Sequence, residues 1–282
     1  MRKKLPLILG KLSKFAPRIA ASIAFHYFAT PIRTPRPESE KLWHETAKKY
    51  FLKNGTAAFE WGNPDGALVI LIHGWNGRGT QLASFANSLV EKNFRVVALD
   101  GPGHGISSGK KTNPSHFAQF IIDAQKELIS TNESQAVIAH SFGGSSTVLA
   151  VSRGLKTKGI VLIASPAFYD RVVDYFVRSM NLSPSSVKIF FELVTKATGL
   201  PPKELNIGII GAKLNLPVLI VHDEVDNAVD YLSAKSIHET WPGSKLLTTQ
   251  GLGHRRILKD KAVITNVTNF IVALGRASIP NL

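Results

Sequence analysis

Three residues of this chain have the types needed for acyl-transfer chemistry, and they follow one another in the order serine, acid, histidine. Ser141 lies in the stretch AHSFGG, Asp226 in VHDEVDNAV and His254 in GLGHRRIL. A serine hydroxyl is a weak nucleophile at its own pKa, so it needs a histidine base within hydrogen-bond reach. That histidine in turn needs a carboxylate that orients it and stabilises its positive charge. The three residue types therefore predict a nucleophile, an orienting acid and a general base.

The hydrophobic pattern predicts the elements that position these residues. Six short runs of β-branched and aliphatic residues alternate with longer stretches of helical character. Continuous apolar runs are typical of strands buried on both faces, and strand–helix alternation predicts parallel strands with right-handed crossovers. We therefore expect an α/β fold with a mostly parallel central sheet and helices on both faces. The predicted strands are residues 67–74, 94–101, 135–141, 159–165, 217–223 and 245–251, and the predicted helices include 80–92, 115–131, 142–154 and 255–275.

Ser141 lies where a predicted strand runs into a predicted helix. A serine at such a junction is either a helix cap or a nucleophile held at a sharp turn. Acid and histidine residues after later strands favour the nucleophile, because sites in parallel sheets form at the carboxyl ends of the strands. A nucleophile at positive φ brings strand and helix close together, so the residues two before and two after it must be small. Ala139 and Gly143 meet that requirement.

Five motifs, in this order and at these intervals, resemble the α/β-hydrolase superfamily and specifically its Ser-His-Asp hydrolases: HGWNGRGTQ, DGPGHGISSG, AHSFGG, VHDEVDNAV and GLGHRRIL. The resemblance covers residues 57–275 and implies the α/β-hydrolase fold. The family pattern G-x-S-x-G is met at Ser141 except at its first position, where Ala139 stands. The resemblance makes His254 the base and Asp226 the acid, with Asp223 as the alternative acid.

The resemblance also implies an oxyanion hole and residues that support it. The backbone N–H groups of Trp75 and Phe142 are the expected donors to the oxyanion. Four further residues are expected to line or support the pocket without reacting: His73, Gly74, His140 and Asp100.

The chain is expected to divide into a hydrolase domain and two additions. Residues 1–50 are predicted to be a basic amphipathic extension and linker, and residues 51–282 the hydrolase domain. Residues 167–215 are predicted to be a small helical cap inserted within that domain. The two predicted cap helices have apolar faces, so we expect a small substrate with a mainly apolar acyl or alcohol moiety and no high charge.

The N-terminal segment combines positive charge with an apolar stripe. Residues 1–37 hold eight Lys and Arg and no acid, out of a net charge of +14. Lys11, Lys14 and Arg18 lie beside apolar residues at helical spacing: Leu5, Ile8, Leu12, Phe15, Ile19 and Ile23. Pro17 is expected to kink or break this helix. Two interpretations remain open for residues 1–30: peripheral contact with an anionic membrane surface, or packing on the protein's own body.

Composition and spacing exclude several other functions. The apolar runs near the N-terminus are too short for a spanning helix or a signal peptide. Cysteine is absent, which excludes disulfides and thiolate sites and fits a cytoplasmic location, with a peripheral membrane location as the alternative. The carboxylates of HDEVD crowd one short loop, so no metal and no cofactor are expected. The basic surface lacks nucleic-acid-binding motifs, so no nucleic-acid partner is expected, and the oligomeric state stays open.

These observations predict an esterase-like serine hydrolase that works through an acyl-enzyme on Ser141. The same three residue types in similar folds also cleave thioesters, lactones and carbon–carbon bonds, and the sequence does not separate these reactions. The alternative from another class is a ligand-binding or signalling protein that keeps the fold and turns over slowly or not at all.

Overall fold

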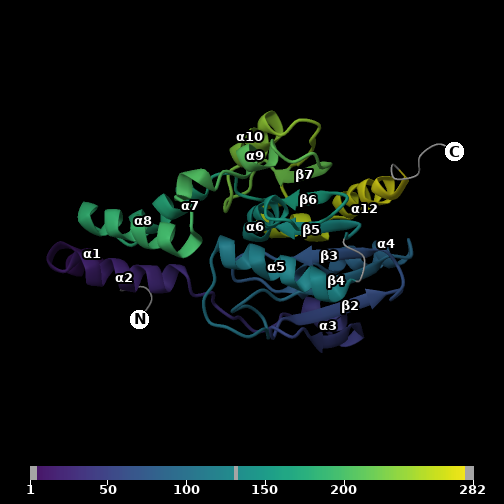
Figure 1. Cartoon of the computed structure of the whole chain (residues 1–282), viewed down its shortest axis with the longest axis horizontal. Coiled ribbons are helices and arrows are strands. Elements are labelled where there is room, and N and C mark those ends of the chain that lie inside the picture. The colour runs from purple at the N-terminus through teal and green to yellow at the C-terminus, as the bar shows by residue number, and fades with distance from the viewer. Residues whose placement is uncertain (1–4, 130–132, 277–282) are drawn as a thin grey trace.

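The computed structural model describes residues 5–129 and 133–276, and in that part of the chain it contains one eight-stranded sheet (Figure 1). The strand order is β1-β2-β4-β3-β5-β6-β7-β8. β1 and β2 pair antiparallel, as do β2 and β4, and the remaining neighbours are parallel. The strands are β1 (Lys48–Phe51), β2 (Ala57–Gly62), β3 (Leu68–Ile72), β4 (Arg95–Leu99), β5 (Ala136–His140), β6 (Ile160–Ile163), β7 (Val218–Asp223) and β8 (Lys245–Thr249).

The helices cover the sheet and extend beyond one of its ends. They are α1 (Leu5–Phe15), α2 (Pro17–Phe28), α3 (Lys41–Thr46), α4 (Ala86–Val90), α5 (Pro114–Leu128), α6 (Phe142–Ser152), α7 (Tyr169–Ser179), α8 (Pro184–Thr198), α9 (Ile207–Gly211), α10 (Leu232–Thr240), α11 (Gly253–Arg256) and α12 (Lys261–Arg276). Short 3-10 segments are Glu38–Glu40, Gly79–Phe85, Pro202–Glu204 and Ile257–Lys259. α1, α2, α7 and α8 lie together at one end of the molecule (Figure 1).

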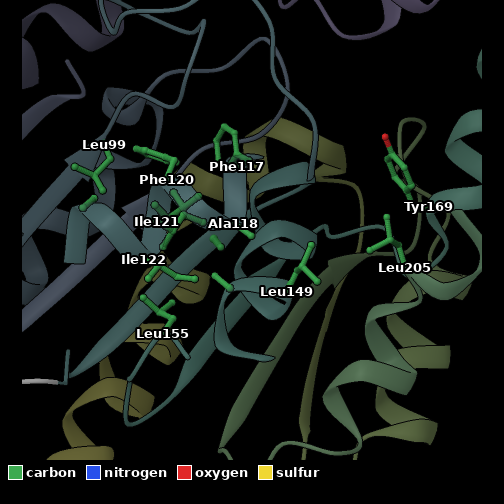
Figure 2. Close-up of a cluster of buried hydrophobic side chains, with 14 of the residues drawn as sticks. Leu99, Phe117, Ala118, Phe120, Ile121, Ile122, Leu149, Leu155, Tyr169 and Leu205 are labelled. Carbon is green, nitrogen blue, oxygen red and sulfur yellow. The ribbon is translucent and has the colours of Figure 1, made fainter. Parts of the chain in front are cut away.

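Alternate residues of the central strands face two separate cores. Ile70 and Ile72 of β3 pack with α5 and α6 on one face, whereas Val69 and Leu71 pack with α4 and α12 on the other. Side chains of α5 and α6 fill the first of these clusters (Figure 2). Because β3 is buried on both faces, it has the continuous apolar sequence from which a parallel strand was expected.

The predicted α/β architecture is confirmed, and the six predicted strands correspond to β3 through β8. The sequence pattern did not reveal β1 and β2. β1 is an exposed edge strand, and β2 contains a buried charge, Glu60, which accepts hydrogen bonds from Tyr50 Oη at 2.6 Å and from Arg95 Nη2 at 2.7 Å. The predicted helix 80–92 is instead a 3-10 segment followed by the short α4. The tighter winding begins at Gly79, whose N–H donates to the buried carboxylate of Asp100 at 2.7 Å.

The N-terminal helices are part of the folded body. Pro17 ends α1 as expected, and because proline has no N–H, the carbonyl of Ser13 loses its helical partner. The Ser183 hydroxyl at the start of α8 donates to that carbonyl at 2.7 Å. α2 buries Ala20 and Ala24 in the core cluster that also contains α8 residues. The predicted domain boundary at residue 50 falls within β1.

Within the described ranges, every helix is too short or too polar to cross a lipid bilayer.

Candidate active site

Ser141 occupies the turn between β5 and α6, with φ 53° and ψ −127°. A non-glycine residue at positive φ is strained, and the fold holds it there: the Ser141 N–H donates to the carbonyl of Ile163 on β6 at 2.8 Å. The turn presses α6 against the loop after β3. A Cβ on Gly143 would lie 2.4 Å from the His73 carbonyl oxygen, so this position requires glycine.

His254 lies in α11, on the loop that follows β8. Its Nε2 is 3.1 Å from Ser141 Oγ, and its Nδ1 is 2.7 Å from Asp226 Oδ2. An ionised carboxylate only accepts hydrogen bonds, so we assign the ring proton to Nδ1. Nε2 is then free to accept the Ser141 hydroxyl proton. We call Ser141, His254 and Asp226 the candidate triad.

Asp226 is buried within its loop after β7 and is held as an anion. Its Oδ1 accepts from the N–H groups of Ala228 at 2.8 Å and Val229 at 3.0 Å. Burial alone would raise the pKa of Asp226, but hydrogen bonds from His254, Val229 and Ala228 outweigh that effect and hold the pKa below its ordinary value. His222 Nε2 lies 3.5 Å from Asp226 Oδ2 and 2.9 Å from the Val229 carbonyl oxygen. The His222 ring thereby connects β7 to the loop that carries Asp226.

Asp223, the alternative acid, bonds to other groups. Its Oδ2 accepts from Thr249 Oγ1 at 2.7 Å and from the Leu252 N–H at 2.9 Å. These bonds tie the end of β7 to the loop that leads into His254. Of the two carboxylates, Asp226 is the one that the structure places against the His254 ring.

The two expected oxyanion donors lie beside Ser141. Trp75 and Phe142 line the same cavity as Ser141 and His254. Among residues 5–129 and 133–276, the backbone N–H groups of Trp75 and Phe142 have no acceptor within the protein. Phe142 is the first residue of α6, where the unpaired N–H groups and the helix dipole favour negative charge.

His104 fixes the loop that carries Trp75, and sequence reasoning did not identify this role. Its Nε2 accepts from the N–H of Asn76 at 3.1 Å, and its Nδ1 donates to the Pro102 carbonyl at 3.0 Å. Burial lowers the pKa of His104 to about 3, so the ring stays neutral and Nε2 remains an acceptor. The signal in the sequence was the DGPGHG turn.

His73 and His140 support the site from within the fold. His73 Nδ1 donates to the Gly74 carbonyl at 2.7 Å, while its Nε2 accepts from the Gly101 N–H at 2.8 Å. His140 Nε2 donates to the backbone carbonyl of His254 at 2.9 Å. Burial lowers the pKa of His73 to about 4 and that of His140 to about 3, so both rings are neutral near pH 7.

Gly74 and Asp100 support the site without lining the cavity. A Cβ on Gly74 would lie 2.8 Å from the Ser141 Cβ, so glycine leaves room for the nucleophile. Asp100 is fully buried and accepts from the N–H groups of Gly79 at 2.7 Å and Ile106 at 2.9 Å. Burial raises the pKa of Asp100. It holds two loops together and is not among the residues that line the cavity.

A cavity of about 470 Å³ opens above Ser141 and His254. Its walls are largely aromatic and apolar, and one side is built by α2 and α7. These two helices supply one cation, Arg171, and the aromatic or apolar residues Tyr27, Phe28, Tyr169, Val172, Tyr175 and Phe176. Sequence reasoning missed the wall residues Tyr27 and Phe28; the aromatic sequence FHYF at residues 25–28 was the available signal.

The described residues contain no group of His, Cys, Asp or Glu side chains arranged to hold a metal ion.

Comparison with known proteins relates the chain to hydrolases. A family model described as serine aminopeptidase, S33, matches residues 63–198, and one described as TAP-like protein matches residues 201–277. Proline iminopeptidase PfmaB of Pestalotiopsis fici is 37% identical over 87 residues, which are 29% of this chain and 30% of that protein. The chain thus spans less than a third of that relative.

Two broader matches cover most of the chain. Uncharacterized protein YfhR of Escherichia coli (strain K12) is 22% identical over 257 residues, covering 84% of this chain and 83% of that protein. The crystal structure of a putative lipase from Acinetobacter baumannii superposes with a TM-score of 0.68 and 18% identity, covering 86% of this chain and 96% of that one. The family models and the fold together show that this chain belongs to the α/β-hydrolase superfamily.

Proposed function

We propose that the protein is a serine hydrolase that cleaves a carboxylic ester or a related acyl bond through an acyl-enzyme on Ser141. The observation that supports this most directly is the chain of hydrogen bonds from Ser141 Oγ through His254 to Asp226, with lengths of 3.1 Å and 2.7 Å. Ser141 and His254 line a largely apolar cavity that is large enough for a small acyl group.

In the first half-reaction, Ser141 Oγ attacks the carbonyl carbon and passes its proton to His254 Nε2. Asp226 stabilises the resulting imidazolium through Nδ1. The N–H groups of Trp75 and Phe142 receive the oxyanion. The tetrahedral intermediate then collapses: the bond to the leaving group breaks, and His254 Nε2 gives its proton to the leaving oxygen.

In the second half-reaction, water attacks the acyl carbon and gives a proton to His254 Nε2. Collapse of the second intermediate returns that proton to Ser141 Oγ and releases the acid. The His140 ring lies 4.6 Å from the His254 ring, centroid to centroid. Because burial keeps His140 neutral, it adds no charge that would oppose the imidazolium.

The cavity walls favour an apolar acyl or alcohol moiety over a charged amine. An aminopeptidase substrate presents a free ammonium group, which needs a carboxylate partner in the pocket. Among the described residues that line the cavity, Asp230 is the one carboxylate, and it is exposed and already accepts from the Leu232 N–H at 2.8 Å. The printed descriptions of the S33 family and of PfmaB make aminopeptidase the second candidate to be tested.

Labelling with a fluorophosphonate probe tests the nucleophile, with Ser141→Ala as the control. We expect the wild-type protein to be labelled and the variant not to be. A panel then compares acyl esters of graded chain length, a matched thioester and a prolyl anilide. Multiple turnovers on apolar esters support the proposal. Preference for the prolyl anilide would assign an aminopeptidase, and a single turnover with tight product binding would assign a ligand-binding protein.

A further inference from the structure

α1 and α2 expose an apolar face that the protein itself does not cover. In the described part of the chain, fifteen large apolar side chains are exposed, and six of them lie on these two helices. Phe15 is 88% exposed, the highest value among the fifteen. We call these six residues the outer face: Leu7, Ile8, Phe15, Ile19, Ile23 and Tyr27.

The exposure of the outer face does not result from loose docking of α1 and α2, because the opposite side of the same helices is well packed. That side buries Leu9, Ser13, Ala20 and Ala24, and large apolar residues such as Phe25 and Phe28 pack against the same core cluster as α8. Ser183, the N-cap of α8, and Ser186 within it donate hydrogen bonds to the Ser13 and Pro17 carbonyls at 2.7 Å and 3.1 Å. The outer face therefore stays in solvent although these helices already have a packed apolar side, whereas a helix that packs only on its own protein exposes mainly polar residues on its other side.

The charges beside the outer face are all positive. Lys11, Lys14 and Arg18 are exposed on α1 and α2, and neither helix contains an acid. The packed partners α7 and α8 are nearly balanced, with four bases and three acids. An exposed apolar face bordered by Lys and Arg is the pattern by which helices lie in an anionic lipid surface.

The outer face continues to the mouth of the Ser141 cavity. Ile19, Ile23 and Tyr27 are spaced four residues apart along α2, so they share one side of the helix. Tyr27 also lines the cavity. Across the mouth, Tyr175 and Val172 of α7 line the cavity and are 78% and 37% exposed.

We propose that the outer face of α1 and α2 docks on an anionic lipid bilayer, and that docking presents the cavity mouth to esters dissolved in that bilayer. The docking step stands on exposure and charge alone, and the delivery of esters rests on the proposed hydrolase function. The apolar side chains enter the boundary between headgroups and acyl chains, while Lys11, Lys14 and Arg18 contact lipid phosphates.

Cosedimentation of the full-length protein with vesicles tests the docking. The vesicles are phosphatidylcholine alone or phosphatidylcholine mixed with phosphatidylglycerol. We expect binding to the anionic vesicles that weakens at high salt. The triple variant Ile8→Ser, Phe15→Ser, Ile19→Ser should bind roughly tenfold or more weakly, since exposed apolar contact with lipid is lost. A matched control, Leu42→Ser, Phe51→Ser, Ile209→Ser, removes apolar side chains that are 66%, 61% and 55% exposed elsewhere and should bind like the wild type.

Charge reversal separates lipid electrostatics from apolar contact. Lys11→Glu, Lys14→Glu, Arg18→Glu should also weaken binding roughly tenfold or more, because each base contributes near an anionic surface. The reversal of three exposed lysines on other elements, Lys92, Lys245 and Lys261, is the control and should have a much smaller effect. Equal loss in both charge variants would overturn the proposal, because it would reflect overall charge.

Two further outcomes would contradict the docking. Equal binding of the outer-face variant and the wild type would place the lipid contact elsewhere. A dimer in the absence of lipid that the outer-face variant abolishes would assign the face to a second copy of the chain.

Hydrolysis of a short soluble ester should be the same in all of these variants. Vesicle binding without any ester hydrolysis would leave the docking intact and contradict the proposed function.

Discussion

The residues around Ser141 and the helical arm formed by α1, α2, α7 and α8 are built in different ways. Ser141 and Asp226 follow the fully buried strands β5 and β7, and His254 follows the partly exposed edge strand β8. Backbone hydrogen bonds fix Ser141 to β6 and Asp226 to Ala228 and Val229. The arm is held largely by side-chain packing and keeps large apolar residues in solvent. If the proposed function is right, the chemistry depends on the sheet and its loops, and the arm contributes the wall of the cavity.

Aromatic contacts link the arm's two distant chain segments. Phe28 of α2 packs against Phe176 of α7 at 4.8 Å between ring centroids and against Phe190 of α8 at 5.5 Å. The ends of these two segments, Tyr27 and Phe28 of α2 and residues 169–176 of α7, therefore meet in one wall of the cavity. This difference predicts two kinds of variant. Substitutions in the candidate triad should lower the rate for every substrate, and substitutions in the arm should change which substrates are preferred.

Ser141→Ala should have the largest effect. Without the nucleophile, acyl transfer loses its first step, and kcat should fall by on the order of 10⁴-fold or more on short and long esters alike. His254→Ala should cost a similar factor, and the double variant should be little worse than either single one because the residues act as a unit. Steady-state kinetics across the ester panel measures this. Residual activity that depends on acyl length would contradict the separation of the two regions.

Asp226→Asn should be far more harmful than Asp223→Asn. An amide cannot stabilise the imidazolium and can hold His254 in the wrong tautomer, so kcat should fall on the order of 10²-fold or more. Asp223→Asn removes bonds to Thr249 and Leu252 but leaves the His254 partner in place, so its main effect should be on stability. Kinetics and thermal melting of both variants give the comparison. The reverse ranking of kcat would make Asp223 the acid.

Much of the fold was predictable because the parallel strands are buried on both faces. β3 consists wholly of apolar residues, and β7 is apolar up to Val221 and ends in His222 and Asp223, just before Asp226. β1 and β2 were not predictable in the same way, because Glu60 stabilises their pairing from within the strand through bonds to Tyr50 and Arg95. Such a strand looks polar until its partners are known.

The candidate site was predictable in its residues but not in its supporting contacts. The order of Ser141, Asp226 and His254 and the motif around each identified the set. Nothing local to the sequence indicates that His140 donates to the His254 carbonyl, because that bond joins residues 114 positions apart. The aromatic wall from α2 was missed for the same reason: it meets α7 only through tertiary packing.

Buried neutral histidines near the sheet edge should make stability depend on pH. Burial lowers the pKa of His140 to about 3, while the unfolded chain titrates near 6.5. Between these two pH values the unfolded state binds a proton that the folded state does not. The contribution of neutral His140 to the free energy of unfolding is therefore fully present above pH 6.5 and is lost as the pH falls. His140 alone should contribute a loss of about 2 kcal/mol between pH 7 and pH 5.

The variant His140→Gln isolates this contribution, since its amide can still donate to the His254 carbonyl. Urea unfolding at both pH values should show a smaller loss of stability in the variant than in the wild type. If the variant and the wild type lose the same free energy of unfolding between pH 7 and pH 5, His140 is not the group that titrates.

Phe28→Ala should change substrate choice more than rate. Removing the ring enlarges the cavity wall, so kcat/KM for long or bulky acyl chains should rise relative to short ones, by roughly tenfold. Phe25→Ala is the matched control: Phe25 packs on Phe190 at 6.1 Å from the same helix but does not line the cavity. The ratio of kcat/KM for a long and a short ester is the measurement. A uniform loss of kcat would show that the arm positions the candidate triad after all.

Ser183→Ala should have the smallest effect, confined to the junction of the arm. The Ser183 hydroxyl donates to the Ser13 carbonyl, which Pro17 leaves without a helical partner, and it accepts from the Ser186 N–H at 3.4 Å as the cap of α8. Losing this cap should lower the free energy of unfolding by about 1 kcal/mol. Ser22→Ala, at an exposed position of α2, is the control and should have almost no effect. Urea unfolding measures both variants, and kcat on a short ester should be unchanged in each. A fall in kcat with Ser183→Ala would mean that the arm's attachment reaches the chemistry at Ser141.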